Sequence, residues 1–204
     1  MGRSMEPQKR KEQILAIAAD IFAKKGYHET GVADIIEQAG IARGTFYLYF
    51  SSKRQVFTEV MSKILLELAD RLEAVDPENK SESVVDQFRK NLKAIFNYFI
   101  EYPQMAKILL AQVGSVDSEA EQDFSEAHSM LNQVIRAYLL RGQIESVLRD
   151  FNVETYSYMI LGGIREVVFH LVVKKDMDAQ LDDIIEGIVR YNCFGILKEN
   201  IEIE

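Results

Sequence analysis

The stretch GYHETGVADIIEQAGIARGTFYLYFSSKRQVF, residues 26–57, contains two short helical patterns joined by a tight turn. The first pattern, residues 32–39, brings apolar side chains to one side of a helix, and Gly40 suits the left-handed turn that closes it. The second pattern, residues 43–50, has Phe46 and Phe50 four positions apart, so both rings share one face. Two short helices joined by a glycine-containing turn are typical of a helix-turn-helix.

The other side chains of the second pattern are suited to DNA. If the two phenylalanines hold this helix against the rest of the domain, Arg43, Thr45, Tyr47 and Tyr49 must point elsewhere. Lys53, in the first turn of the next helix, adds a further positive charge. Arginine can pair with guanine or phosphate, threonine can touch a thymine methyl group, and tyrosine hydroxyls can reach phosphate oxygens. Gly44 lets the backbone approach a groove. Taken alone, Tyr47 and Tyr49 are better explained as packing residues, and Arg43 and Lys53 as solvated charges. The surrounding motif gives these residues their functional interpretation.

The whole stretch resembles the DNA-binding head of the TetR family of bacterial transcriptional regulators. The resemblance covers Gly26 to Phe57 and includes the A-G-[I/V]-x-x-G-T-x-Y-x-[H/Y]-F core from Ala39 to Phe50 and the serine and lysine at 52 and 53. It implies that the helix starting at Arg43 enters the major groove. The residues that it implies for contacts with bases or phosphates are Thr30, Arg43, Gly44, Thr45, Tyr47, Tyr49 and Lys53.

Two positions depart from the family pattern. Gly31 occupies the place where threonine or serine usually caps the second helix, and Ala42 the place where serine often caps the recognition helix. Glycine at an N-cap costs only a few tenths of a kcal/mol, whereas alanine costs roughly 0.5 to 2 kcal/mol. Neither change removes the fold, but both remove a hydroxyl that would contact phosphate.

The charges are distributed unevenly along the chain. Residues 1–63 hold ten Lys and Arg against seven Asp and Glu, whereas residues 64–204 hold fourteen against twenty-five, within a net charge of −8. A basic head on an acidic body is compatible with phosphate binding by the head, because binding depends on local charge. An imbalance of this size can also arise by chance.

The 204 residues predict an all-α protein of about nine helices. Besides the two of the motif, these span about 8–25, 52–75, 103–112, 118–141, 153–174 and 179–198, with one more between a Ser81 cap and Pro103. We expect a DNA-binding domain over residues 1–52 and a ligand-binding and dimerisation domain over 53–204, bridged by the helix from 53 to about 75. We also expect the protein to remain in the cytoplasm, because no apolar run of about 18 residues and no secretion signal is present.

The last two helices are unusually apolar and contain glycines. A glycine inside a helix costs about 1 kcal/mol relative to alanine, which is tolerated where another helix must approach closely. We therefore expect this pair to form half of a four-helix dimer interface, with packing inside the monomer core as the alternative. The residues expected at the interface are Gly162, Val167, His170, Ile188, Tyr191 and Gly195.

A ligand pocket is expected in the helical body, because the resemblance implies one there. Aromatic side chains and methionines suit an apolar guest, although a plain hydrophobic core explains each of them as well. The candidate lining residues are Phe96, Phe99, Tyr102, Met105, Phe124, His128, Met130, Tyr138, Met159 and Phe169. No metal or cofactor is expected, because a lone histidine on an apolar helix face is usually a core residue and the single Cys193 cannot build a thiolate site.

These features favour a homodimeric repressor that binds a palindromic DNA operator and is released by a small, largely apolar effector. Acyl compounds and cationic drugs both suit the acidic, apolar body. A helical enzyme is a weaker alternative, because the sequence has no recognisable Ser-His-Asp order, metal-ligand spacing or phosphate loop. A helical interaction module that does not touch DNA is a third hypothesis.

Overall fold

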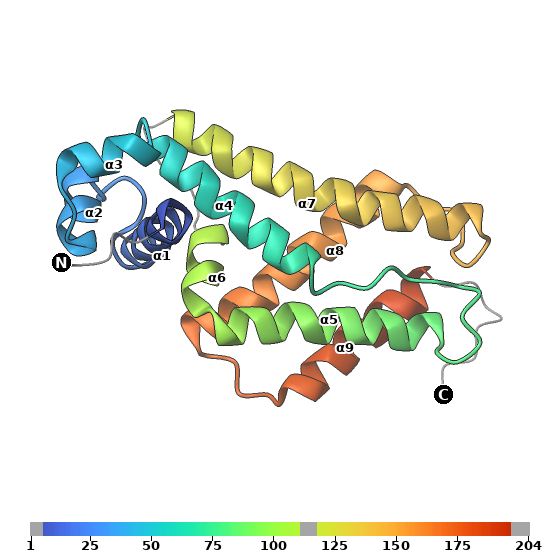
Figure 1. Ribbon diagram of the computed structural model, residues 1–204. Helices are drawn as coiled ribbons and strands as arrows, with labels where there is room; N and C mark the ends of the chain where they lie inside the picture. Colours follow the sequence, from blue (N-terminus) through green and yellow to red (C-terminus); the bar gives the residue numbers. More distant parts are fainter. Residues whose placement is uncertain (1–5, 111–117, 197–204) are drawn as a thin grey trace. The chain divides into compact units, whose positions relative to one another are not determined.

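The computed structural model describes residues 6–110 and 118–196, without the side chains of 118–124, 126–127 and 194–196. Every regular element in these ranges is helical (Figure 1), which confirms the predicted all-α class. In chain order they are α1 (Pro7–Lys25), α2 (Val32–Ala39), α3 (Arg43–Tyr49), α4 (Lys53–Ala69), α5 (Val84–Glu101), α6 (Pro103–Leu109), α7 (Ser118–Ile144), α8 (Val153–Val168), the π-helical turn η1 (Phe169–Lys174) and α9 (Leu181–Ile196).

The chain forms two compact units, and each unit is built from two separate segments of the sequence. The first unit contains residues 1–66 and 102–127, and the second contains residues 67–101 and 128–204. The helices α4 and α7 each contribute to both units. The expected functional boundary between residues 52 and 53 is a different division and stays a prediction.

The core of the first unit is built around α1. Gly26 ends this helix with its N–H donating to the Phe22 carbonyl at 2.9 Å, as the sequence predicted. The Phe22 ring lies edge-on to Phe57 of α4 at 5.5 Å, and Tyr27 lies 4.7 Å from the same ring. Both α2 and α6 pack on α1, so α1 is the centre of this core.

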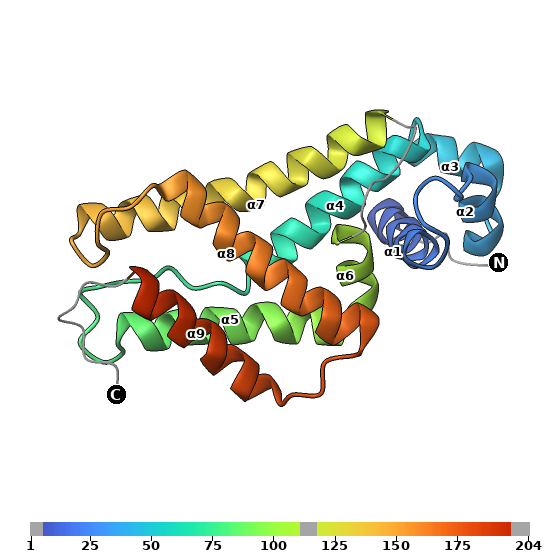
Figure 2. The same ribbon diagram turned by 180° about the vertical axis from the view of Figure 1, so that it is seen from behind.

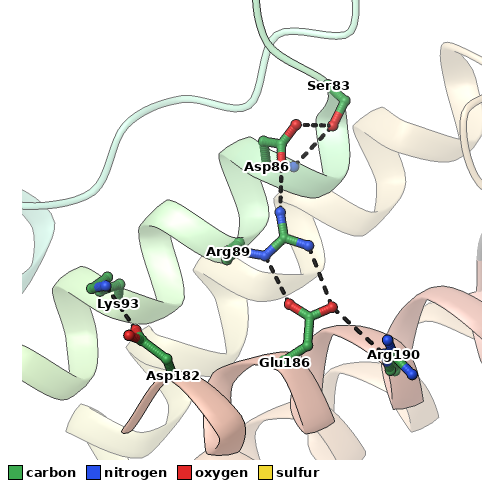
Figure 3. Close-up of polar contacts among 7 residues, drawn as sticks. All are labelled: Ser83, Asp86, Arg89, Lys93, Asp182, Glu186 and Arg190. Carbon is green, nitrogen blue, oxygen red and sulfur yellow. Dashed lines mark hydrogen bonds and ion pairs between the residues drawn. The ribbon is translucent and has the colours of Figure 1, made fainter. Parts of the chain in front are cut away.

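In the second unit, buried side chains and surface ion pairs join α5 to α9. Phe96 of α5 and Val189 of α9 are fully buried. Arg89 Nε donates to Glu186 Oε2 at 3.0 Å and its guanidinium also pairs with Asp86, while Lys93 Nζ lies 2.7 Å from Asp182 Oδ1 (Figure 3). The hydrogen bond to Glu186 is the main reason why the pKa of Arg89 is raised. These contacts fix the register of the two helices.

The helix predicted from 52 to about 75 ends earlier, at Ala69. Side chains of α5 replace the hydrogen bonds that further turns of this helix would have made. Asn91 Oδ1 accepts from the Glu73 N–H at 2.9 Å, and Gln87 Oε1 accepts from the Asp76 N–H at 2.7 Å. The sequence pattern did not predict this end, because the residues that cause it lie far along the chain.

The cap of α5 is also corrected by the structure. Ser83, rather than the predicted Ser81, accepts a hydrogen bond from the Asp86 N–H at 3.1 Å. The Ser81 hydroxyl instead donates to Asn79 Oδ1 at 2.7 Å, within the preceding turn. Both serines have suitable chemistry, so the choice between them depends on where the turn finishes.

The helix predicted over 153–174 is continuous but changes from α to π geometry at Phe169. By length and composition this 22-residue segment is apolar enough to cross a membrane, although only 22% of its most apolar 18-residue window is buried. Arg165 and Glu166 interrupt the apolar run within it. Most residues of that window are therefore at least partly exposed in the single chain.

Candidate DNA-binding interface

The turn between α2 and α3 is set by Gly40. Its φ of 60° and ψ of 37° lie in the left-handed region, where a side chain would be strained. The Gly40 N–H donates to Glu37 O at 3.1 Å, and the Ile41 N–H to Ile36 O at 3.2 Å. These bonds end α2, and α3 begins three residues after Gly40, at Arg43. The predicted turn is therefore confirmed.

The start of α2 is held by a carboxylate instead of a hydroxyl cap. Asp34 Oδ2 accepts from the Gly31 N–H at 2.7 Å, and Asp34 Oδ1 lies 2.8 Å from Lys25 Nζ. The hydrogen bond with Lys25, followed by the one with Gly31, lowers the pKa of Asp34. Asp34 thus compensates for the missing side chain at Gly31 and ties α2 to the end of α1.

Two phenylalanines fix the orientation of α3. Phe46 is 0% exposed and Phe50 is buried beside it, with their ring centroids 5.7 Å apart. Ile35 of α2 is also fully buried. The predicted inward face of α3 is therefore present, and the side chains on its other faces have their directions set by this anchor.

The outer face of α3 combines a cation, an aromatic ring and an aliphatic side chain. Tyr47 is 46% exposed and Leu48 is 81% exposed, while Arg43 and Gly44 are exposed at the start of the helix. The Arg43 guanidinium lies 5.8 Å from the centre of the Tyr47 ring. The sequence analysis missed Leu48, although its helical position, two residues from each phenylalanine, places it opposite them.

The remaining expected contact residues are less accessible. Thr45 and Tyr49 are half-buried on the flanks of α3. Thr30 is only 1% exposed, and its hydroxyl donates to the Gly26 carbonyl at 2.7 Å, so it braces the turn before α2. Lys53 Nζ donates to the Tyr27 carbonyl at 2.8 Å and lies 4.2 Å from the centre of the Tyr27 ring. Thr30 in particular is not presented to a phosphate.

Comparison with known proteins identifies this region. Residues 14–60, which include α2, α3 and the turn between them, match the model of the family described as bacterial regulatory proteins, tetR family. This part of the chain is therefore similar to the DNA-binding region of the TetR family. Members of this family are transcriptional regulators and not enzymes, so the protein is a DNA-binding transcriptional regulator.

Relatives extend over most of the chain. An uncharacterised HTH-type transcriptional regulator of Bacillus subtilis, YdgC, is 29% identical over 74% of this chain and 83% of its own length. The fatty acid metabolism regulator protein of the same organism is 26% identical over 87% of this chain and 92% of its own length. The similarity in sequence to these regulators therefore extends from the head into the body.

Solved structures agree with this fold. A TetR-family regulator from Syntrophomonas wolfei has a TM-score of 0.78 at 20% identity, covering 91% of this chain and 94% of its own. The regulator FadR from Bacillus subtilis, solved in complex with stearoyl-CoA, has a TM-score of 0.72 at 22% identity, covering 88% and 95%. At these identities the likeness shows the shared architecture.

The expected pocket residues do not share one environment. Phe96 and Phe99 are buried in the second unit and Met105 in the first, whereas three others lie on exposed surface, namely Met130, Tyr138 and Met159. Tyr102, His128 and Phe169 are half-buried, and the Phe124 side chain lies outside the described residues. Within the described residues, no group of three or more His, Cys, Asp or Glu is arranged to hold a metal ion. The pocket assignments stay predictions.

The expected dimer residues come from α8, η1 and α9. Tyr191 is 71% exposed, and a Cβ built on Gly162 would meet nothing within 4 Å. Val167, His170 and Ile188 are half-buried, and Gly195 lies outside the described side chains. His170 is held by Asp176 Oδ1 at 2.8 Å from Nδ1 and by Glu166 Oε1 at 3.2 Å from Nε2.

Proposed function

We propose that this chain is a cytoplasmic repressor that binds a palindromic operator as a homodimer and is released by a small, largely apolar effector. The observation that carries the proposal is the outer face of α3. Its exposed Arg43, Gly44 and Tyr47 lie on a helix that the buried Phe46 and Phe50 hold in place. A helix presented in this way fits the major groove, with its first residues at the base edges.

The contact residues divide by their placement. Arg43 has no carboxylate partner among the described residues, so its guanidinium is available for guanine or phosphate. Tyr47 offers a hydroxyl for phosphate, and Leu48 offers an apolar surface for a thymine methyl group. Lys53 must exchange its bonds to backbone carbonyls for a phosphate, while Thr30 acts through the turn that it braces.

The exposed face of α8 supports the proposed dimer. Thr155, Met159, Gly162 and Glu166 recur at helical spacing on the side opposite to the buried Ser157. An apolar helix that is exposed in one chain requires a partner, and open glycine positions let a second helix come close. A twofold dimer would present two α3 helices about 34 Å apart, one DNA turn, to matching half-sites.

Acyl compounds are the effector class that the relatives support best. One relative is named a fatty acid metabolism regulator, and a protein of similar fold was solved with stearoyl-CoA. We therefore propose a long-chain acyl thioester as the effector, in preference to a cationic drug. Its binding would release the operator only if the thioester binds more tightly to the form of the dimer that does not fit DNA.

Operator binding by the purified protein tests the proposal. Fluorescence anisotropy with labelled DNA from the region upstream of the chain's own gene should show tight, salt-sensitive binding that an unrelated duplex does not compete. Stearoyl-CoA should then release the labelled DNA. Equal affinity for related and unrelated duplexes, or no binding at any salt concentration, would contradict the proposed function.

A further inference from the structure

A buried polar pair joins α7 to α8 within the second unit. Asn132 of α7 is 4% exposed and Ser157 of α8 is 0% exposed, and Ser157 Oγ lies 3.1 Å from Asn132 Oδ1. Figures 1 and 2 both show α8 beginning beside α7. Ser157 Oγ also lies 2.7 Å from the Glu154 carbonyl of its own helix. Asn132 Nδ2 is buried and has no protein partner in the described part of the chain.

The protons of this pair leave the Asn132 amide incompletely bonded. A serine hydroxyl has one proton, and the shorter contact directs it to the Glu154 carbonyl. The Asn132 oxygen faces Ser157, and both N–H groups of Nδ2 lack an acceptor in the described part of the chain. A turned amide would direct one of these two groups to Ser157 Oγ.

Buried leucines follow the pair on both helices. Leu139 lies two turns further along the same face of α7, and Leu161 lies one turn beyond Ser157 on α8. The half-buried His128 lies one turn before Asn132 on α7. Burying an amide donor without a partner costs stability, so such groups in folded proteins call for a specific explanation. A leucine would fit the shape of this position without that cost.

We propose that Asn132 anchors the effector by donating a hydrogen bond to the carbonyl oxygen of an acyl thioester. This assignment rests on the proposed function and names the group that recognises the ligand. The thioester carbonyl is the acceptor that joins directly to the apolar acyl chain, so a single buried donor between two helices matches it. A ligand at this point contacts both α7 and α8, and α8 carries the proposed dimer face on its opposite side.

The test compares two ligands that differ at one atom. Stearoyl-CoA has the carbonyl oxygen, and the thioether octadecyl-CoA lacks it. We expect wild-type protein to bind stearoyl-CoA about tenfold more tightly by calorimetry, the size of one good buried hydrogen bond. This comparison needs no variant. In Asn132→Leu the preference should fall to about onefold, whereas Gln133→Leu, the same type of change at an exposed neighbour on α7, should keep it.

Thermal unfolding without ligand separates recognition from a structural role. Asn132→Leu should melt at or above the temperature of wild type, because it removes an unpartnered donor. The assignment is overturned if wild type binds neither ligand, if it binds both equally, or if Asn132→Leu melts lower and keeps the preference. Operator binding is scored separately, so its absence would overturn the proposed function, while the carbonyl preference alone decides the role of Asn132.

Discussion

The outer faces of α3 and α8 are both exposed, but they differ in what fixes them. The face of α3 is set from within the chain, by Phe46 and Phe50 beneath it and by Gly40 before it. The face of α8 carries open glycines and exposed aromatic and methionine side chains, and none of the residues that the structure describes covers them. The DNA-binding surface is thus specified within one chain, whereas the α8 surface would be completed by the second chain of the proposed dimer.

The largest expected effect breaks the internal support of α3. Phe46→Ala should lower the free energy of unfolding by about 3–5 kcal/mol, because it empties a fully buried ring site. Leu48→Ala, two residues away and 81% exposed, should change it by less than about 0.5 kcal/mol. Urea denaturation of both variants measures the contrast. Similar losses at the two positions would mean that α3 is not anchored as described.

The two glycines of the motif should respond with opposite signs. Gly40→Ala should destabilise the protein by about 1–2 kcal/mol, because alanine is strained at a φ of 60°. Gly44→Ala should stabilise it by about 0.5–1 kcal/mol, because Gly44 is helical and a Cβ there meets nothing within 4 Å. Thermal melting compares the two. Stabilisation by Gly40→Ala would contradict the turn geometry.

The effect of Gly162→Ala on α8 should depend on whether a second chain packs against this helix. In an isolated chain, Gly162→Ala should stabilise the helix by about 1 kcal/mol, because its surroundings are open. In a close four-helix interface the added methyl group should instead weaken the dimer. Analytical ultracentrifugation should show a higher dissociation constant for Gly162→Ala than for wild type. An unchanged constant with a higher melting temperature would place the dimer interface elsewhere.

A smaller effect is the pH dependence of stability caused by His170 in η1, the turn that follows α8. The hydrogen bond with Asp176, assisted by Glu166, raises the pKa of His170 above its ordinary value of 6.5. The protonated histidine therefore contributes its full stabilisation below about pH 6.5, and this is lost as the pH rises through the raised pKa. His170→Gln should flatten that part of the melting curve against pH. An NMR titration that places the pKa of His170 at or below 6.5 would refute the stabilisation of protonated His170 by Asp176 and Glu166.

The sequence predicted the head well because its signals are local. Gly40 marks the turn, and the spacing of Phe46 and Phe50 marks the inward face, so the bounds of α2 and α3 followed from neighbouring residues. The end of α4 and the cap of α5 were wrong because they depend on distant partners, such as Asn91 for the Glu73 N–H.

The body was less predictable for the same reason. Met130 and Met159 suit an apolar pocket by type, yet both are exposed, because helical spacing alone does not say which neighbour covers a face. Asn132 was missed, although a polar residue at a core-facing helical position is a signal that sequence can carry. Its importance depends on Ser157, twenty-five positions later, and only the fold brings the two together.

Operator affinity, measured together with stability, shows whether α3 reads DNA through its outer face. Tyr47→Ala should weaken operator binding by about tenfold or more and leave the melting temperature nearly unchanged. The control variant Lys107→Ala, at an exposed position on α6, should leave both operator affinity and melting temperature nearly unchanged. Arg43→Ala should in addition reduce the slope of log affinity against log salt by about one. Full operator affinity in Tyr47→Ala and Arg43→Ala, with the fold intact, would contradict the account.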